Sequence, residues 1–185
     1  MINNNQLRRV LAFSDAIVAV AITLLVLPLT DLFQENRIVS LSMILSSAKF
    51  YSVFSSLIVS FFVIFGFWND HNTLFKDNKK VTKLVLRLNE LWCFSIILIP
   101  AITSMSFNIN TQASYVIYGF GLWFSAMTIS IMKFLLLTDK PPITNTLLLL
   151  TISILLLLIF PKIDSTIYYI VFLAVPLNKI FPKLA

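Results

Sequence analysis

Four polar residues set among apolar ones are the part of this sequence whose types and spacing could do chemistry. Asp15 lies about two turns inside the first apolar segment, Arg9 precedes it, and His71 and Asn89 follow later in the chain. Inside a membrane such groups are costly unless they are paired, so each is a candidate functional residue. Together they could form a hydrogen-bonded network that locks helices together, which is the commoner role, or a proton relay or catalytic site. The other polar side chains expected to be buried at this depth are Trp68, Arg87 and Glu90.

The composition places these residues in a membrane protein. Of the 185 residues, 58% are hydrophobic and 12% are charged, and the mean hydropathy is +0.91, whereas soluble domains are about 45–50% apolar and about 25% charged. The single cysteine, Cys93, excludes an intramolecular disulfide, and no residues have zinc-ligand spacing. With a lone histidine and scattered carboxylates, the sequence predicts no cofactor, no metal site and no enzyme.

Apolar runs of roughly 17–25 residues predict the spanning helices. We expect one all-α membrane domain over residues 1–185, with six transmembrane helices and both termini on the same side. Segment 38–46 is too short to cross and is expected to form an interfacial turn of helix. The expected spans are about 8–29, 47–69, 84–105, 112–137, 144–160 and 165–182.

The placement of Lys and Arg predicts the orientation. With the N-terminus inside, eleven of these residues lie on the cytoplasmic side, and Arg37, Lys49 and Lys162 lie outside. This bias predicts a multi-pass protein of the cell membrane with cytoplasmic termini, and it accounts for the net charge of +6 without nucleic-acid binding. The eleven residues are Arg8, Arg9, Lys76, Lys79, Lys80, Lys83, Arg87, Lys133, Lys140, Lys179 and Lys183.

The first apolar segment is expected to be a spanning helix that carries function. It continues well past a small-residue tripeptide that is similar to a cleavage site, so a signal peptide is not expected. At about 100° per residue, Val20, Thr23 and Leu27 share one face, and Asp15 lies about 140° from Val20. The Asp15 face is expected to turn toward sibling helices, which leaves the other face for lipid or for a symmetry-related copy. Pro28 is expected to end or kink the helix.

This first segment resembles the signature of a known family, the transmembrane protein 175 family of potassium channels. The family pattern R-x-x-x-F-S-D is present as Arg9-x-x-x-Phe13-Ser14-Asp15. Later family elements are present as Trp68-x-x-His71 at the end of the second span and Leu88-Asn89 in the third. The resemblance covers about residues 9–103, and Glu90 departs from it because an apolar residue is expected there.

The resemblance implies a potassium-permeable leak channel of the single-repeat, prokaryotic type. Four copies would form a homotetramer in membrane lipid, with the first helix lining the pore for K⁺. Val20 and Leu27 match the family's apolar constriction, and Thr23 matches the position linked to moderate preference for potassium over sodium. Selectivity would come from side chains, because the chain has no T-V-G-Y-G filter. The residues implied to anchor the pore helix are Arg9, Phe13, Ser14, Asp15, Trp68, His71 and Asn89.

A second class of function stays open at this point, namely a proton- or ion-coupled secondary transporter. Asp15, Glu90 and His71 motivate it, because ionisable groups in spanning helices can relay protons. The absence of an internal repeat and of glycine-broken helices weighs against it.

Overall fold

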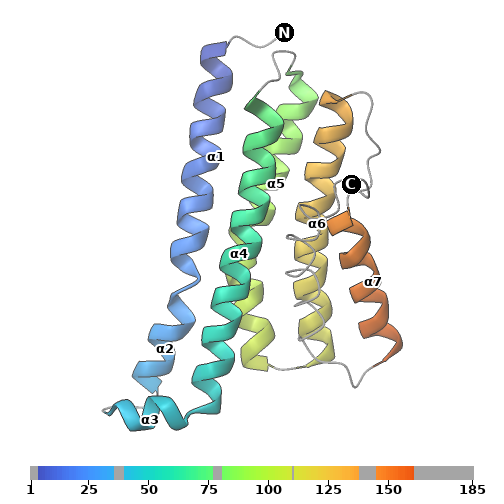
Figure 1. The fold of residues 1–185 in the computed structure, drawn as a ribbon. Coiled ribbons are helices and arrows are strands. Elements are labelled where there is room, and N and C mark those ends of the chain that lie inside the picture. The colour runs from blue at the N-terminus through green and yellow to red at the C-terminus, as the bar shows by residue number, and fades with distance from the viewer. Residues whose placement is uncertain (1–3, 36–39, 77–80, 110, 138–144, 161–185) are drawn as a thin grey trace.

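The computed structural model describes residues 4–35, 40–76, 81–109, 111–137 and 145–160, and over these residues the fold is entirely helical (Figure 1). The helices run up and down side by side, apart from a short α3 at one end of the bundle. Their bounds are α1 Asn4–Leu24, α2 Leu27–Glu35, α3 Leu41–Ser46, α4 Ala48–Lys76, α5 Lys83–Ile109, α6 Gln112–Leu136 and α7 Asn145–Ile159.

Four helical stretches are long and apolar enough to cross a membrane. They are Asn5–Phe33, Ala48–Lys76, Lys83–Ser106 and Gln112–Leu136. The predicted membrane class and the first four spans are therefore confirmed. The fifth expected span corresponds to α7, whose 15 residues rise only about 22 Å against a hydrocarbon core of about 30 Å. The sixth expected span, 165–182, lies outside the described residues.

The first span is interrupted between α1 and α2. Two bonds of the tighter i to i−3 type end α1, from Leu25 N to Ile22 O and from Val26 N to Thr23 O, both 3.3 Å long. Pro28 has no N–H to donate to the carbonyl of Leu24, four residues earlier, so it cannot continue the α-helical ladder and instead lies in the first turn of α2. The kink expected at Pro28 is confirmed, and the span continues beyond it.

Two further boundaries have different causes, a local cap for α3 and tertiary packing for the end of α4. Ser40 caps α3 by accepting a hydrogen bond from the Met43 N–H, which confirms the short helix expected over 38–46. α4 extends seven residues past the expected end of the second span, because His71, Leu74 and Phe75 follow one face at i, i+3 and i+4 and are all buried. Much of the polar stretch between the second and third spans is thus helical.

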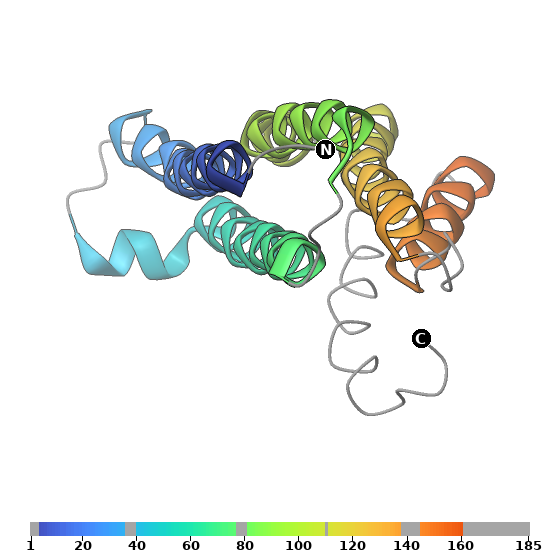
Figure 2. The same cartoon turned by 90° about the horizontal axis from the view of Figure 1, so that it is seen from above.

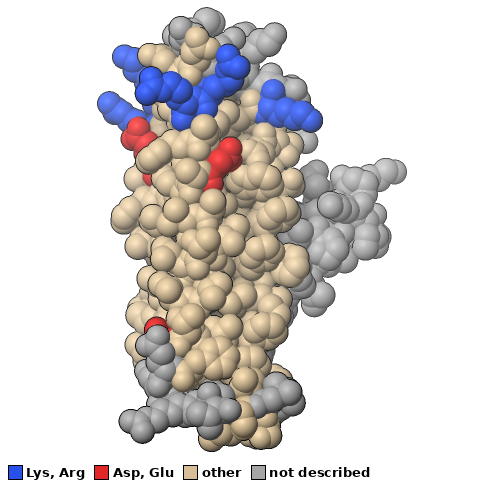
Figure 3. Space-filling model, turned by 90° about the vertical axis from the view of Figure 1, so that its left-hand side faces the viewer, with Lys and Arg blue, Asp and Glu red and all other residues tan. Residues whose placement is uncertain are grey.

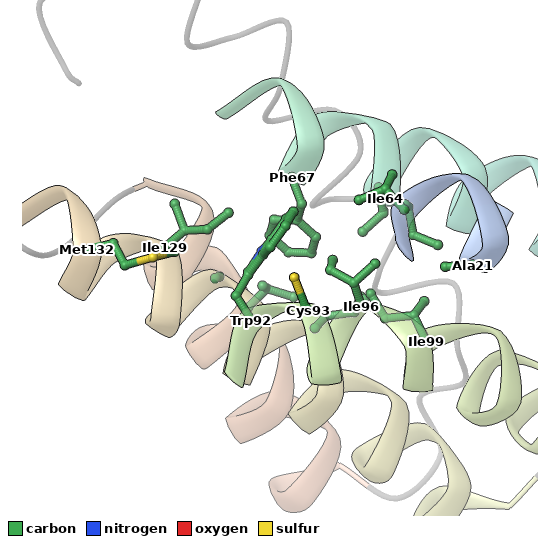
Figure 4. Close-up of a cluster of buried hydrophobic side chains, with 14 of the residues drawn as sticks. Ala21, Ile64, Phe67, Trp92, Cys93, Ile96, Ile99, Ile129 and Met132 are labelled. Atoms are coloured by element: carbon green, nitrogen blue, oxygen red, sulfur yellow. The ribbon is translucent and has the colours of Figure 1, made fainter. Parts of the chain in front are cut away.

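α5 lies at the centre of the packing. Viewed from above, α1 and α4 flank it on one side and α6 on the other, with α7 outside α6 (Figure 2). Trp92, Ile96 and Ile99 of α5 are fully buried, and they meet Ile64 and Phe67 of α4 and Ala21 of α1 (Figure 4). Among the described residues, α1 is therefore packed against the bundle along one side.

Hydrogen bonds between hydroxyl groups join α4, α5 and α6. Ser60 of α4 lies 3.1 Å from the Thr103 hydroxyl and 3.2 Å from that of Tyr118, which links α4, α5 and α6. Ser125 donates to Ser95 at 2.8 Å, which joins α6 to α5 a second time. Such interhelical bonds hold helices together where lipid supplies little hydrophobic driving force between them.

Charged side chains divide unevenly between the two ends of the bundle. The structure describes seven Lys and Arg residues, of which only Lys49 lies at the α3 end. The other six lie at the opposite end, and Figure 3 shows basic side chains gathered at that end, with acidic ones just below them and a mostly uncharged surface further along. They are Arg8, Arg9, Lys76, Lys83, Arg87 and Lys133.

Candidate functional site

The face of α1 that packs into the bundle is defined by small and branched residues. Ser14, Val18 and Ala21, with Leu25 directly after the end of α1, follow one another at spacings of four, three and four, and all are buried. This periodicity is that of one helical face. Ser14 is the polar member of this face, and of the four residues it lies nearest to the end of the bundle that carries the six clustered Lys and Arg residues.

A buried chain of hydrogen bonds starts at Ser14 and joins three helices. Asn89 of α5 donates from Nδ2 to the Ser14 hydroxyl at 2.9 Å, and its Oδ1 lies 2.6 Å from Nε2 of His71 on α4. Ser14 donates in turn to the Val10 carbonyl at 3.1 Å, and the Cys93 thiol lies 3.4 Å from its oxygen. We call Ser14, His71 and Asn89 the buried triad.

The direction of these bonds fixes the form of the histidine. Because the Asn89 amide nitrogen donates to Ser14, its oxygen is left as an acceptor, so Nε2 of His71 carries the proton. Nδ1 of His71 is buried with no hydrogen-bond partner among the described residues, and so is Nε1 of Trp92. The two rings stack, with centroids 4.2 Å apart and an interplanar angle of 8°.

Asp15 belongs to a different contact from the buried triad. Its Oδ1 accepts a hydrogen bond of 2.9 Å from Nε1 of Trp68, a half-buried residue of α4. Asp15 itself is exposed. It therefore lies at the edge of the α1–α4 contact, and the centre of the buried face is the Ser14 side of the helix.

The Asp15–Trp68 bond gives a graded prediction. Asp15→Ala removes the acceptor and leaves the half-buried indole N–H unpaired, so the free energy of unfolding should fall by about 1–2 kcal/mol. Asp15→Asn keeps an oxygen at the same place and should have a smaller effect. Thermal unfolding of the purified protein in detergent measures both, and equal losses for the two variants would contradict the role of this bond.

The remaining candidate residues near this site are exposed. Among the described residues, Arg9 makes no ion pair with Asp15, and Phe13 is 66% exposed. Arg87 and Glu90 are also exposed, so the expectation that they are buried is wrong. The reason is helical geometry, because only the face of α5 that carries Asn89 points toward α1 and α4 at this depth.

The apolar stripe of the first span consists of Val20 and Thr23 of α1 and Leu27 at the start of α2, and all three are exposed. We call these three residues the exposed stripe of α1. Val20 is 47% exposed, Leu27 is 53% exposed, and Thr23 between them is exposed as well. The Thr23 hydroxyl donates to the Val20 carbonyl at 2.7 Å. Its hydrogen is thus directed at the backbone, and its oxygen lone pairs remain available on the exposed face.

Three residues of this region were missed by reasoning on the sequence. Trp92 and Cys93 follow Asn89 at i+3 and i+4, a spacing that already places them on the triad's face. Thr30 follows Thr23 by seven residues, is exposed, and donates to the Leu27 carbonyl at 2.7 Å in the same manner. Its heptad spacing from Thr23 was the available signal.

Comparison with known proteins covers the part of the chain that carries these residues. Residues 9–100 match the family described as "Endosomal/lysosomal potassium channel TMEM175". That range contains all members of the buried triad, the Asp15–Trp68 contact and the exposed stripe of α1. No solved structure matches the chain.

A bacterial relative extends the similarity. A potassium channel of Chryseobacterium sp. (strain P1-3) is 32% identical over 126 residues, which cover 68% of this chain and 62% of the relative. The match thus spans about three fifths of the relative's own length. With the signature residues gathered on three adjacent helices and both comparisons in agreement, the chain belongs to the TMEM175 family.

Proposed function

We propose that this protein is a potassium channel with moderate selectivity over sodium, and that the exposed stripe of α1 lines its pore. The observation that carries the proposal is the two-sided character of α1. One side is held in the bundle by Ser14, Val18 and Ala21, while the side that carries Val20 is about half exposed and is not part of the packed core of the described residues. Family membership and the bacterial relative described as a potassium channel support the same function.

The pore requires several copies of the chain. A single stripe of one helix cannot enclose an ion path, so we propose a homotetramer in which four α1 helices surround the axis. Val20 and Leu27 then form two apolar rings, with a ring of four Thr23 hydroxyls between them. The α1–α2 break lies between Thr23 and Leu27 and gives the pore helix a bend within this neck.

Selectivity follows from the chemistry of these rings. Apolar collars oppose hydrated ions when they are narrow and pass them when the helices move apart. The Thr23 oxygens replace part of the hydration shell inside the neck, and potassium gives up its water at lower cost than sodium. Hydroxyls on side chains form a softer cage than fixed backbone carbonyls, so the preference for potassium is moderate.

The buried triad acts as the anchor of the pore helix. It joins α1 to α4 and α5 at Ser14, near the middle of α1 and about two turns before Val20. The triad ends on the Val10 carbonyl and includes no carboxylate, which makes it a poor proton relay. This chemistry favours a channel over a proton-coupled transporter.

The charge distribution supports an orientation. Six of the seven described cations lie at the end where α1 begins, and positive charge is retained on the cytoplasmic side of membranes. We propose a protein of the cell membrane whose N-terminus is cytoplasmic.

The reversal potential tests the function. The purified chain is reconstituted in a planar bilayer with potassium chloride on one side and sodium chloride on the other. The expected current reverses close to the potassium equilibrium potential. Flux that appears only with a proton gradient and saturates with substrate would overturn the channel and restore the transporter.

A further inference from the structure

A groove of about 930 Å³ runs between α1 and α5 on the outside of the bundle. Both helices start at the same end (Figure 1), so their first turns form one end of the groove. Arg9 and Lys83 line that end. Further along, the walls are apolar and are made by Phe13, Ile17, Phe94 and Ile97.

The groove has the polarity of an amphiphile. Arg9 and Lys83 are both exposed. They line the end of the groove at which basic side chains gather on the surface of the bundle (Figure 3). Ile97 lies 14 residues after Lys83, about 21 Å further along the helix axis. Phe13 and Phe94 are 66% and 59% exposed, which is a large apolar area for two neighbouring helices to leave open.

We propose that this groove binds an anionic phospholipid. The phosphate of the headgroup lies against Arg9 and Lys83, and one acyl chain lies over Phe13, Phe94 and Ile97. Basic pockets between spanning helices at the membrane surface hold anionic headgroups in this way. Binding of the lipid does not depend on whether the chain conducts ions.

Charge distinguishes this occupant from a second copy of the chain. A neighbouring apolar helix would cover the phenylalanines but would bring no anion to Arg9 and Lys83. Glu90 lines the same groove two turns beyond Lys83 and is exposed. Its carboxylate disfavours a phosphate at that depth, which holds the headgroup at the basic end.

The lipid also touches the anchor of the pore helix. Asn89 and Cys93 line the groove while being 2% and 4% exposed, so they form its floor. An acyl chain in the groove packs over the contact between α1 and α5. Bound lipid should therefore raise the melting temperature of the protein.

The test compares two lipids on the full chain purified in detergent. Phosphatidylglycerol and phosphatidylcholine with the same acyl chains are added separately, and bound lipid is counted by native mass spectrometry while melting is followed in parallel. Phosphatidylglycerol should bind more tightly and stabilise more. Lys83→Gln should weaken its binding about fivefold, whereas Arg87→Gln should leave it unchanged, because Arg87 is exposed one turn further along α5 and does not line the groove.

A second variant tests the acyl chain without changing charge. Ile97→Trp fills the apolar part of the groove and should weaken the binding of phosphatidylglycerol in a protein that still folds, since the added ring projects into open space. Equal binding and stabilisation by both lipids would overturn the proposal. The proposal would also be overturned if Lys83→Gln and Arg87→Gln bound phosphatidylglycerol equally well. The same holds if Ile97→Trp bound this lipid as tightly as the unchanged protein does.

Discussion

Replacing Thr23 with valine should lower the ratio of potassium to sodium permeability while current persists. Valine has nearly the same shape as threonine, so the neck keeps its width and loses only the four oxygens proposed to replace water around the ion. A loss of about 1 kcal/mol in the preference of the neck for potassium corresponds to a roughly fivefold fall in the ratio. Reversal potentials under bi-ionic conditions measure this ratio directly.

Thr30 provides the matched control for this experiment. It is exposed like Thr23, and its hydroxyl donates to a carbonyl three residues earlier at the same 2.7 Å as that of Thr23. It lies beyond Leu27, however, and so outside the proposed neck. Thr30→Val should leave the permeability ratio unchanged, and Thr23→Ser should preserve it because the hydroxyl remains.

Two outcomes would contradict the role of Thr23. An unchanged ratio in Thr23→Val would show that its hydroxyl does not contribute to selectivity. If the permeability ratio fell equally in Thr23→Val and Thr30→Val, the effect would not be specific to the proposed neck, because loss of either hydroxyl would have the same result. The proposed channel itself would survive either result, because the apolar rings do not depend on the hydroxyl.

Periodicity predicted much of α1 because the physics of that helix is local. The separation of Val20 from Asp15 follows from 100° per residue, and the kink follows from the missing N–H of Pro28. Span ends inside long apolar runs were predicted closely, as for α6, because hydrophobic length sets them. These features need no knowledge of which helices are neighbours.

The composition of the buried triad could not be derived in that way. Periodicity placed Asp15 on the face opposite Val20, but the face that the neighbours cover is centred on Ser14. That choice depends on where α5 lies, because Asn89 must reach both Ser14 and His71. Asp15 and Asn89 are both polar residues within apolar segments, and the three-dimensional packing shows that Asp15 is exposed and Asn89 is buried.

The end of α4 shows the same limit. The run from Asn69 to Lys76 is polar enough to suggest a loop, yet it is helical. Within it, His71 stacks on Trp92 and lies 4.9 Å from Phe75 between ring centroids. Tertiary contacts of this kind override the local preference of a polar segment.

Asn89→Leu should destabilise the protein more than any other single change in the triad. Asn89 is 2% exposed and bonds to both other members, so a leucine of similar size removes two hydrogen bonds at once. Nε2 of His71 would lose its acceptor while Nδ1 already has no partner among the described residues. Leaving such a buried donor unpaired costs about 1–3 kcal/mol, and the free energy of unfolding should fall by that amount.

The place where Asn89→Leu loosens the protein distinguishes an anchor of α1 from a general contribution to packing. Hydrogen exchange should rise mainly in α1, because the triad holds that helix against α4 and α5. Ser95→Ala is the matched control, since Ser95 is buried on the same helix but bonds to Ser125 of α6. It should leave exchange in α1 unchanged.

A compensating variant makes the prediction stricter. Replacing both partners of a buried hydrogen bond with apolar groups is nearly neutral, whereas removing one leaves the other unpaired. His71→Phe combined with Asn89→Leu should therefore recover most of the stability lost in Asn89→Leu alone, and the phenylalanine ring can still stack on Trp92. If the double variant unfolds more easily than Asn89→Leu, the unpaired histidine is not the cause of the lost stability. The packing around the histidine ring would then hold the triad together, and its hydrogen bonds would not.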